Sequence, residues 1–192
     1  MVLLIYCALV DKVKLRQKLL QQRKSMLVSE WQHKSERIAE HLQASSLFTG
    51  AKTVLAYFSF RQEPDLSSLF VDNNYIWGFP RCVGKSLHWH QVTGSDSIAK
   101  GSYAIMEPNT DSPQIYPEEV DLILVPTVAC DYQGYRLGSG GGYYDRLLSS
   151  PLWQGKTTIG IVFDFAYLSK LPIEPWDIRL SGICTEIGLH MN

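Results

Sequence analysis

The sequence predicts an α/β fold, namely a three-layer α/β/α sandwich with a mostly parallel central sheet and helices at the N-terminus. Residues 11–26 contain no glycine or proline and place apolar side chains at helical spacing, which favours a helix. After residue 53 the pattern changes to short β-branched and aromatic runs. One of these runs, DLILVP at 121–126, is continuously apolar, as is typical of a parallel strand covered on both faces.

The first ten residues are apolar, but no basic segment precedes them, and Asp11 and Lys12 follow at once. This apolar run is too short to span a bilayer. We therefore expect residues 1–10 to form a buried N-terminal strand or a disordered extension. Residues 11–192 are expected to form a single domain.

A second helix is predicted after the first one. Ser29 and Gln32 have the spacing of a capping box, and Trp31, Ile38 and Leu42 mark the inner face of this helix.

Strands and short helices alternate through the rest of the chain. Pro64 and Asp65 are typical of a helix start, and a further short helix is expected around residues 143–148. The polar stretch from Gly94 to Pro117 is expected to be mostly loop. The predicted strands are 53–60, 75–81, 87–92, 121–126, 157–163 and 182–189.

The composition is that of a compact globular protein. Of the 192 residues 45% are hydrophobic, and the net charge of −1 favours neither a nucleic acid nor an anionic membrane as a partner. The four cysteines are scattered without metal-ligand spacing. They favour a reduced compartment and predict a cytoplasmic protein.

A glycine-rich segment, RLGSGGGYYDR at 136–146, lies beyond the end of the buried strand 121–126. The carboxyl ends of parallel strands are where α/β proteins bind their ligands. The segment fits neither a dinucleotide fingerprint, which needs glycine where Tyr143 stands, nor a Walker A motif. Its amides, with Arg136 and Arg146, nevertheless predict an anion site, and the alternative is a flexible turn before a helix.

Two other patterns are weaker. QGKT at 154–157 resembles part of a Walker A motif, but position 150 is serine and the segment leads into a strand. His88 and His90 in HWH share one face of a strand, and exposed strand residues are a better interpretation than a metal pair.

Several charged residues each have two interpretations. The positive helix face with Lys12, Lys14 and Arg16 is either solvated or faces an anionic ligand. Glu63 either caps a helix that starts at Pro64 or accepts hydrogen bonds from a ligand amine.

Two carboxylates lie near the glycine segment and near the C-terminus. Asp145 and Asp177 are either helix caps or ligands of Mg²⁺, which needs only one or two carboxylates when phosphates supply the other oxygens.

Together these segments resemble the 5-formyltetrahydrofolate cyclo-ligase family. The resemblance is strongest over DLILVPTVACDYQGYRLGSGGGYYDR at 121–146, and it extends to KVKLR at 12–16 and YFSFRQEPD at 57–65. FPRCVG at 79–84, YAIMEP at 103–108 and LPIEPWDIRLSGICTE at 171–186 also look like family segments. The resemblance therefore covers about residues 11–187.

The resemblance implies an enzyme that uses ATP and Mg²⁺ to convert 5-formyltetrahydrofolate to 5,10-methenyltetrahydrofolate, ADP and phosphate through an N5-iminium phosphate. It implies a monomer with catalytic roles for Arg136, Tyr143 and Asp145, and Mg²⁺ ligands at Asp145 and Asp177.

The resemblance also implies binding residues for both substrates. For ATP these are Lys12, Val13, Lys14, Leu15, Arg16, Arg136, Leu137, Gly138, Ser139, Gly140, Gly141, Gly142, Tyr143 and Tyr144. For the reduced folate they are Phe58, Glu63, Ser139, Gly140, Gly141, Gly142 and Tyr143.

The sequence departs from the family pattern at a few positions. Many members have lysine where Gly141 stands, which leaves open which cation balances the transferred phosphate. Cys130 replaces a usual phenylalanine, and Trp176 replaces a frequent histidine. Two other functions remain alternatives: a folate- or nucleotide-binding module without turnover, and a kinase-like enzyme that acts on another small acceptor.

Overall fold

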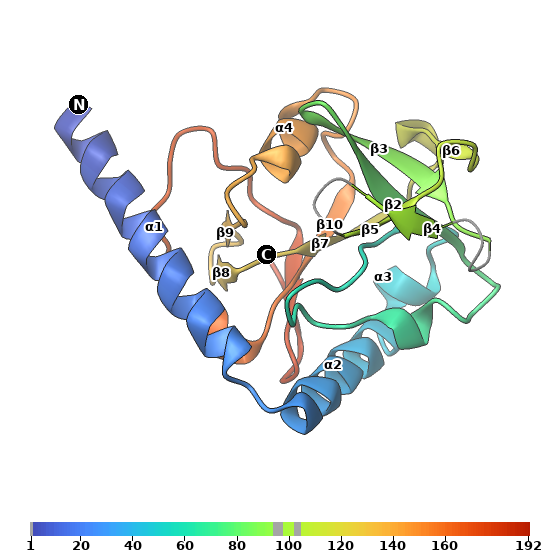
Figure 1. Cartoon of the computed structure of the whole chain (residues 1–192), viewed down its shortest axis with the longest axis horizontal. Helices are drawn as coiled ribbons and strands as arrows, with labels where there is room; N and C mark the ends of the chain where they lie inside the picture. The colour runs from blue at the N-terminus through green and yellow to red at the C-terminus, as the bar shows by residue number, and fades with distance from the viewer. Residues whose placement is uncertain (1, 94–97, 102–104) are drawn as a thin grey trace.

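The computed structural model describes residues 2–93, 98–101 and 105–192, and its helices pack around one large sheet (Figure 1). The α-helices are α1 (Val2–Lys24), α2 (Val28–Gln43), α3 (Ser46–Thr49) and α4 (Tyr143–Ser149). Single 3₁₀ turns are η1 (Ser67–Leu69), η3 (Pro117–Glu119) and η4 (Asp164–Ala166).

The central sheet has eight strands in the order β13-β12-β10-β7-β1-β2-β3-β6. The five strands from β12 to β2 are parallel, and antiparallel strands close both edges. This confirms the mostly parallel sheet that the sequence predicts. The bounds are β1 (Thr53–Leu55), β2 (Ile76–Val83), β3 (Ser86–Gln91), β6 (Gln114–Ile115), β7 (Leu122–Pro126), β10 (Thr157–Ile161), β12 (Gly182–Cys184) and β13 (Leu189–Met191).

Two smaller sheets accompany the large one. One consists of β8 (Ala129–Asp131), β9 (Arg136–Leu137) and β11 (Tyr167–Leu168). The other pairs β4 (Ile98–Lys100) with β5 (Met106–Pro108). The sheet with β9 matters for function, because β9 leads directly into the glycine loop.

Alternate residues of the central strands face two different hydrophobic clusters, which makes the fold three-layered. In β7, Leu122 and Leu124 belong to the cluster that contains the buried face of α2. Ile123 and Val125 belong to the other cluster, which contains Leu19 of α1 and the buried leucines of α4. A strand with apolar side chains on both faces is buried between layers, as its continuous apolar run predicts.

Several sequence predictions about local structure are wrong. Residues 2–10 continue α1 rather than forming a strand, and α2 starts at Val28 after an N-cap at Leu27, so the capping box at Ser29 does not exist. The strand expected at 53–60 ends at Leu55, where the chain leaves the sheet.

The remaining differences concern short elements. Only a 3₁₀ turn follows Pro64, with the Asp65 carboxylate accepting from the Ser67 amide. The strand expected at 182–189 is a hairpin of β12 and β13. The stretch 94–117 holds β4, β5 and β6, while residues 94–97 and 102–104, including the start of the YAIMEP segment, lie outside the described residues.

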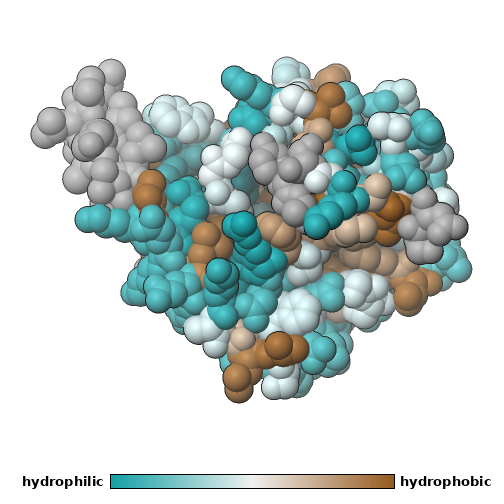
Figure 2. Space-filling model, in the orientation of Figure 1, coloured by the Kyte–Doolittle hydropathy of each residue, from teal (hydrophilic) through white to brown (hydrophobic). Residues whose placement is uncertain are grey.

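The surface is largely hydrophilic on the face in Figure 2. A small hydrophobic group lies at the lower tip, where α1 passes into α2, and Leu27 and Val28 are exposed in this turn. Within the described part of the chain, no helix is long and apolar enough to cross a membrane.

Asp131 holds the hairpin that leads into the glycine loop. The carboxylate is fully buried and accepts hydrogen bonds from the backbone amides of Gln133, Tyr135 and Leu171, at 3.0, 3.0 and 2.9 Å. It therefore joins the turn between β8 and β9 to the C-terminal segment.

We expect Asp131→Asn to lower the free energy of unfolding by about 2 kcal/mol, because a buried amide nitrogen would face at least one of the three N–H donors. Chemical denaturation measures the change. Asp111→Asn is the control, since Asp111 is exposed and accepts a hydrogen bond from the neighbouring Thr110 hydroxyl. Equal stability of the two variants would contradict the role of Asp131.

Candidate active site

The glycine loop, residues 138–142, connects β9 to α4. Gly140 and Gly142 have φ angles of 105° and 67°, in the left-handed region that favours glycine. Gly142 is also the N-cap of α4. The loop conformation therefore depends on glycine at these two positions.

Two carbonyl oxygens of the loop accept hydrogen bonds from arginine side chains, whereas the loop amides do not bond to the described chain. Arg16 Nε donates to the Gly138 carbonyl oxygen at 2.7 Å, and Arg146 Nη2 donates to the Gly141 carbonyl oxygen at 2.9 Å. Within the described chain, none of the backbone amides from 138 to 142 donates a hydrogen bond. Successive unpartnered amides with their carbonyls held elsewhere are the elements of an anion-binding nest.

One face of α1 points into the site. Lys12, Arg16, Leu19 and Arg23 follow each other at intervals of four, three and four residues, so they lie on one stripe of the helix. Lys12 Nζ forms an ion pair with Asp177 Oδ2 at 2.5 Å, and only about a tenth of either side chain is exposed. The helix thus joins the C-terminal segment to the glycine loop.

The other predicted residues of this helix lie differently. Leu15 packs against the core, whereas Val13 and Lys14 are exposed. Burial lowers the pKa of Arg16, and the nearby Asp145 carboxylate partly offsets this effect. ATP contacts by residues 12–16 stay predictions.

Arg136 and Asp145 form an ion pair with a Nη2 to Oδ1 distance of 2.5 Å. The Arg136 side chain is 4% exposed and the Asp145 side chain 37%, so the arginine lies beneath the loop and the carboxylate reaches the surface. Arg136 also lies 5.7 Å from the centre of the Tyr144 ring. Burial raises the pKa of the Tyr144 hydroxyl well above its usual range, which keeps it neutral.

The start of α4 is tied to the turn between β2 and β3. The Tyr143 hydroxyl donates to the Gly84 carbonyl oxygen at 3.2 Å, and Arg146 Nε donates to the Lys85 carbonyl oxygen at 2.7 Å. Since Arg146 also donates to the Gly141 carbonyl oxygen, its guanidinium group joins the glycine loop to this turn.

Glu63 lies in a strained turn beyond the carboxyl end of β1. The two residues before it, Arg61 and Gln62, have φ angles of 51° and 58°, which are uncommon for residues other than glycine. The Glu63 carboxylate accepts from the Phe60 amide at 3.3 Å, upstream of itself, so it is not the helix cap that the sequence allowed. Burial raises the pKa of Glu63, while Arg23 and the Phe60 amide oppose this.

A pocket of about 440 Å³, lined by aromatic and polar side chains, contains Phe58, the predicted folate contact. Phe58 stacks on Phe79 with ring centres 4.1 Å apart, and Phe70 meets both rings edge-on. Tyr75 and Trp77 extend this aromatic lining. A pocket of this size and character suits a flat heteroaromatic ring.

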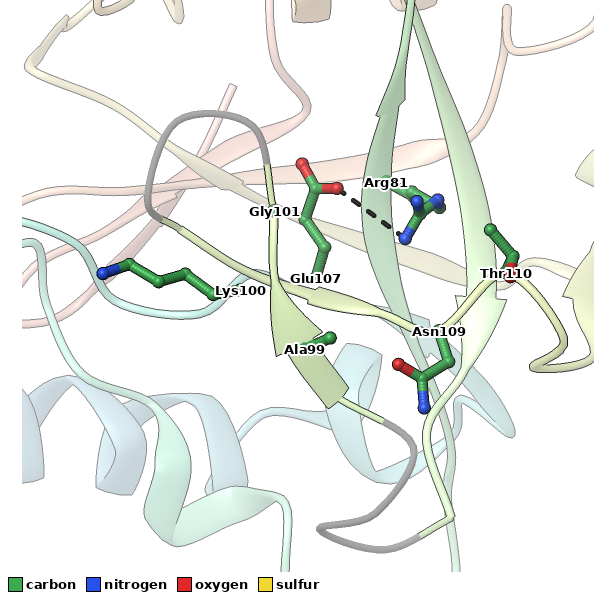
Figure 3. A pocket seen from close by; sticks show the side chains of 7 residues that line it. All are labelled: Arg81, Ala99, Lys100, Gly101, Glu107, Asn109 and Thr110. Atoms are coloured by element: carbon green, nitrogen blue, oxygen red, sulfur yellow. Dashed lines mark ion pairs between the residues drawn. The ribbon is translucent and has the colours of Figure 1, made fainter.

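A second cavity, of about 470 Å³, is polar (Figure 3). Its Arg81 faces Glu107 with a closest distance of 3.9 Å, and Arg81 also donates to the Pro108 carbonyl oxygen. Lys100 points away from this pair in Figure 3. Because Glu107 and the Pro108 carbonyl already interact with the Arg81 guanidinium, we expect this cavity to bind an anion less well than the glycine loop.

The two predicted Mg²⁺ ligands each keep one carboxylate oxygen without a partner in the described chain. Asp145 uses Oδ1 for Arg136, and its Oδ2 lies 4.0 Å from the point where a side chain on Gly142 would begin. Asp177 uses Oδ2 for Lys12 and the Glu174 amide. The free oxygens suit Mg²⁺, which takes few protein ligands beside phosphates. In the described chain no three such residues cluster as a metal site.

The other candidates lie outside this site. His90 is buried and its Nδ1 lies 2.8 Å from the Ser112 carbonyl oxygen, so the expectation that it is exposed is wrong. QGKT does lead into a strand, since β10 begins at Thr157. Lys156 donates to the Val120 carbonyl oxygen.

The geometry defines a class of protein: a mostly parallel α/β protein with a glycine loop of open amides, flanked by arginines, beyond the carboxyl edge of its sheet. Residues 8–186 match the 5-formyltetrahydrofolate cyclo-ligase family, and the chain belongs to this family of enzymes. The resemblance in the glycine loop is thereby confirmed.

Individual relatives agree with the family. The 5-formyltetrahydrofolate cyclo-ligase of Escherichia coli (strain K12) is 29% identical over 178 residues, covering 86% of this chain and 94% of that protein. The Haemophilus influenzae cyclo-ligase is 30% identical over 163 residues, covering 79% and 86%. The solved structure of Aquifex aeolicus 5,10-methenyltetrahydrofolate synthetase has a TM-score of 0.84 at 32% identity, covering 94% of this chain and 92% of that one.

Sequence reasoning missed Arg23, a buried arginine beside Glu63. The signal was present, because Arg23 continues the stripe of Lys12 and Arg16 along the same helix. It was hidden because a basic residue near a helix end usually faces solvent.

We expect Gly140→Ala to weaken binding of inorganic tripolyphosphate, measured by calorimetry. A Cβ at Gly140 meets only Arg16, at 4.0 Å, so the harm comes from the φ angle and not from a clash. Gly155→Ala is the matched control, since Gly155 has a φ angle of 80° and open space around it. Both variants should lose about 1–2 kcal/mol of stability, and only the loop variant should lose affinity. Equal affinities would contradict the anion site.

Proposed function

We propose that this protein catalyses the ATP- and Mg²⁺-dependent cyclisation of 5-formyltetrahydrofolate to 5,10-methenyltetrahydrofolate, releasing ADP and phosphate. The observation that carries the proposal is the set of open amides at 138–142, whose neighbouring carbonyls are held by Arg16 and Arg146. This arrangement suits the β- and γ-phosphates of ATP, and family membership supplies the folate.

The proposed reaction has two covalent steps. The formyl oxygen attacks the γ-phosphorus and ADP leaves, which gives an N5-iminium phosphate. N10 of the folate then adds to the activated carbon, loses its proton, and the C–O bond breaks to release phosphate. Phosphorylation is needed because an amide oxygen is a poor leaving group.

Such a reaction depends on positioning and charge neutralisation more than on a protein nucleophile. Arg136 is fixed beneath the loop by Asp145, where its buried charge favours phosphate binding. Tyr143 is fixed by the Gly84 carbonyl oxygen at the start of α4 and offers its ring to the folate.

The folate is proposed to bind between the loop and the end of β1. Glu63 accepts hydrogen bonds from the N–H groups of the pterin, and Phe58 contributes the aromatic wall of the adjacent pocket. Because the pKa of Glu63 is raised, this carboxylate is protonated at a higher pH than an ordinary one. We therefore expect folate binding to weaken as the pH falls through that range.

Mg²⁺ would neutralise charge on the transferred phosphate. Asp145 would hold it through Oδ2 beside the loop, and Asp177 through Oδ1. We further propose that the enzyme works as a monomer in the cytoplasm.

The test is a spectrophotometric assay, since methenyltetrahydrofolate absorbs in the near ultraviolet. We expect product only with ATP and Mg²⁺ together, loss of activity with a chelator, and recovery with added Mg²⁺. Folate binding without product would favour a binding module, and ATP turnover only with another acceptor would favour a kinase-like enzyme. Either result would overturn the proposal.

We expect Asp145→Asn to reduce kcat by at least about a hundredfold, because it removes the anionic partner of Arg136 and a proposed Mg²⁺ ligand. Raising the Mg²⁺ concentration should restore part of the loss. Asp164→Asn is the control, since Asp164 is exposed and its backbone amide donates to Glu186. Full activity of Asp145→Asn would remove Asp145 from the catalytic site.

A further inference from the structure

Arg23 is a buried charge that the proposed reaction does not use. It ends the inner stripe of α1, is 5% exposed, and its Nη2 lies 3.8 Å from Glu63 Oε1. Its Nε and Nη1 have no hydrogen-bond partner within the described chain. Burying guanidinium nitrogens unpaired is unfavourable, so local packing alone does not explain an arginine here.

The surroundings of Glu63 leave Arg23 as its main charge partner. Arg61 is exposed and lies over the ring of Phe60 at 4.8 Å. Tyr57 and Tyr144 are the other titratable groups that interact with Glu63, and burial keeps both neutral by raising the pKa of each hydroxyl.

We propose that Arg23 is a positioning residue for folate binding, which holds the Glu63 carboxylate ionised and oriented toward the pterin. The inference rests on the proposed function. The C-terminal end of α1 then contributes to folate binding. Lys12 and Arg16, earlier in the same helix, contact Asp177 and the glycine loop.

The sign of the effect follows from the forces on Glu63. Burial raises the pKa of this carboxyl, and Arg23 lowers it. Without the arginine the pKa rises further, so protonation occurs at a higher pH. A protonated carboxyl accepts fewer hydrogen bonds from the pterin N–H groups, and the pH at which folate binding fails therefore moves upward.

The first experiment needs no folate. The Glu63 carboxyl carbon is titrated by ¹³C NMR in the wild-type protein, Arg23→Lys and Arg23→Met, with thermal unfolding to confirm that each variant is folded. We expect a higher midpoint in Arg23→Met and a nearly wild-type midpoint in Arg23→Lys. An unchanged midpoint in a folded Arg23→Met variant would overturn the coupling.

The second experiment measures the Kd of 5-formyltetrahydrofolate and of ATP across pH. We expect Arg23→Met to weaken folate binding by about tenfold between the wild-type midpoint and the shifted one, and to recover at higher pH, with ATP affinity unchanged. Lys24→Met is the matched control, because Lys24 is the exposed neighbour in the same helix turn. In a Glu63→Gln background the pH-dependent effect should vanish.

The outcomes separate the two proposals. If the wild-type protein does not bind 5-formyltetrahydrofolate, the proposed function fails. If it does bind, and Arg23→Met weakens ATP and folate equally or independently of pH, Arg23 has only a structural role. Persistence of the pH-dependent effect in the Glu63→Gln background would also overturn the role of Arg23.

Discussion

The hydrogen bond from Arg16 Nε to the Gly138 carbonyl oxygen joins residues 122 positions apart in sequence. It fixes the register between α1 and the glycine loop, and it turns a loop carbonyl toward the protein. Arg146 does the same for Gly141 from the opposite end of the loop. Because these two carbonyl oxygens are bonded to arginines, the loop has a fixed conformation and its amides stay available to a ligand.

This constraint operates because the fold brings separate segments to one edge. β1 and β7 are parallel neighbours, so the turn with Glu63 and the hairpin that leads to the loop leave the sheet at the same end. α1 then spans both segments, with Arg16 at the loop and Arg23 at Glu63. One helix face therefore sets the separation between the two halves of the proposed site.

Long, uniform segments were predictable from sequence, and short ones were not. β7 is apolar on both faces, β10 is a buried strand, and α4 follows a glycine loop, so each has a local pattern in the sequence. β9 has two residues and β8 three, which is too short for any periodicity to show. Their position depends on Asp131, whose three amide contacts come from segments up to 40 residues away. Arg23 was missed for a related reason. The helical pattern shows that charged side chains share one face, but it does not show which of them other segments of the chain bury.

The hydrogen bonds and ion pairs of the site explain how its cations are held in place before a ligand arrives. Lys12 and Arg136 are each paired with a carboxylate, and Arg16 and Arg146 are each bonded to loop carbonyls. Four cations against the two carboxylates Asp145 and Asp177 leave the region positive, which is the sign that a magnesium–nucleotide complex requires. Both carboxylates keep one oxygen outside their ion pairs, so a metal can be added without breaking them. The proposed nucleotide and its metal would therefore bind with the positions of the cations already set, and the proposed phosphoryl transfer would need little reorganisation.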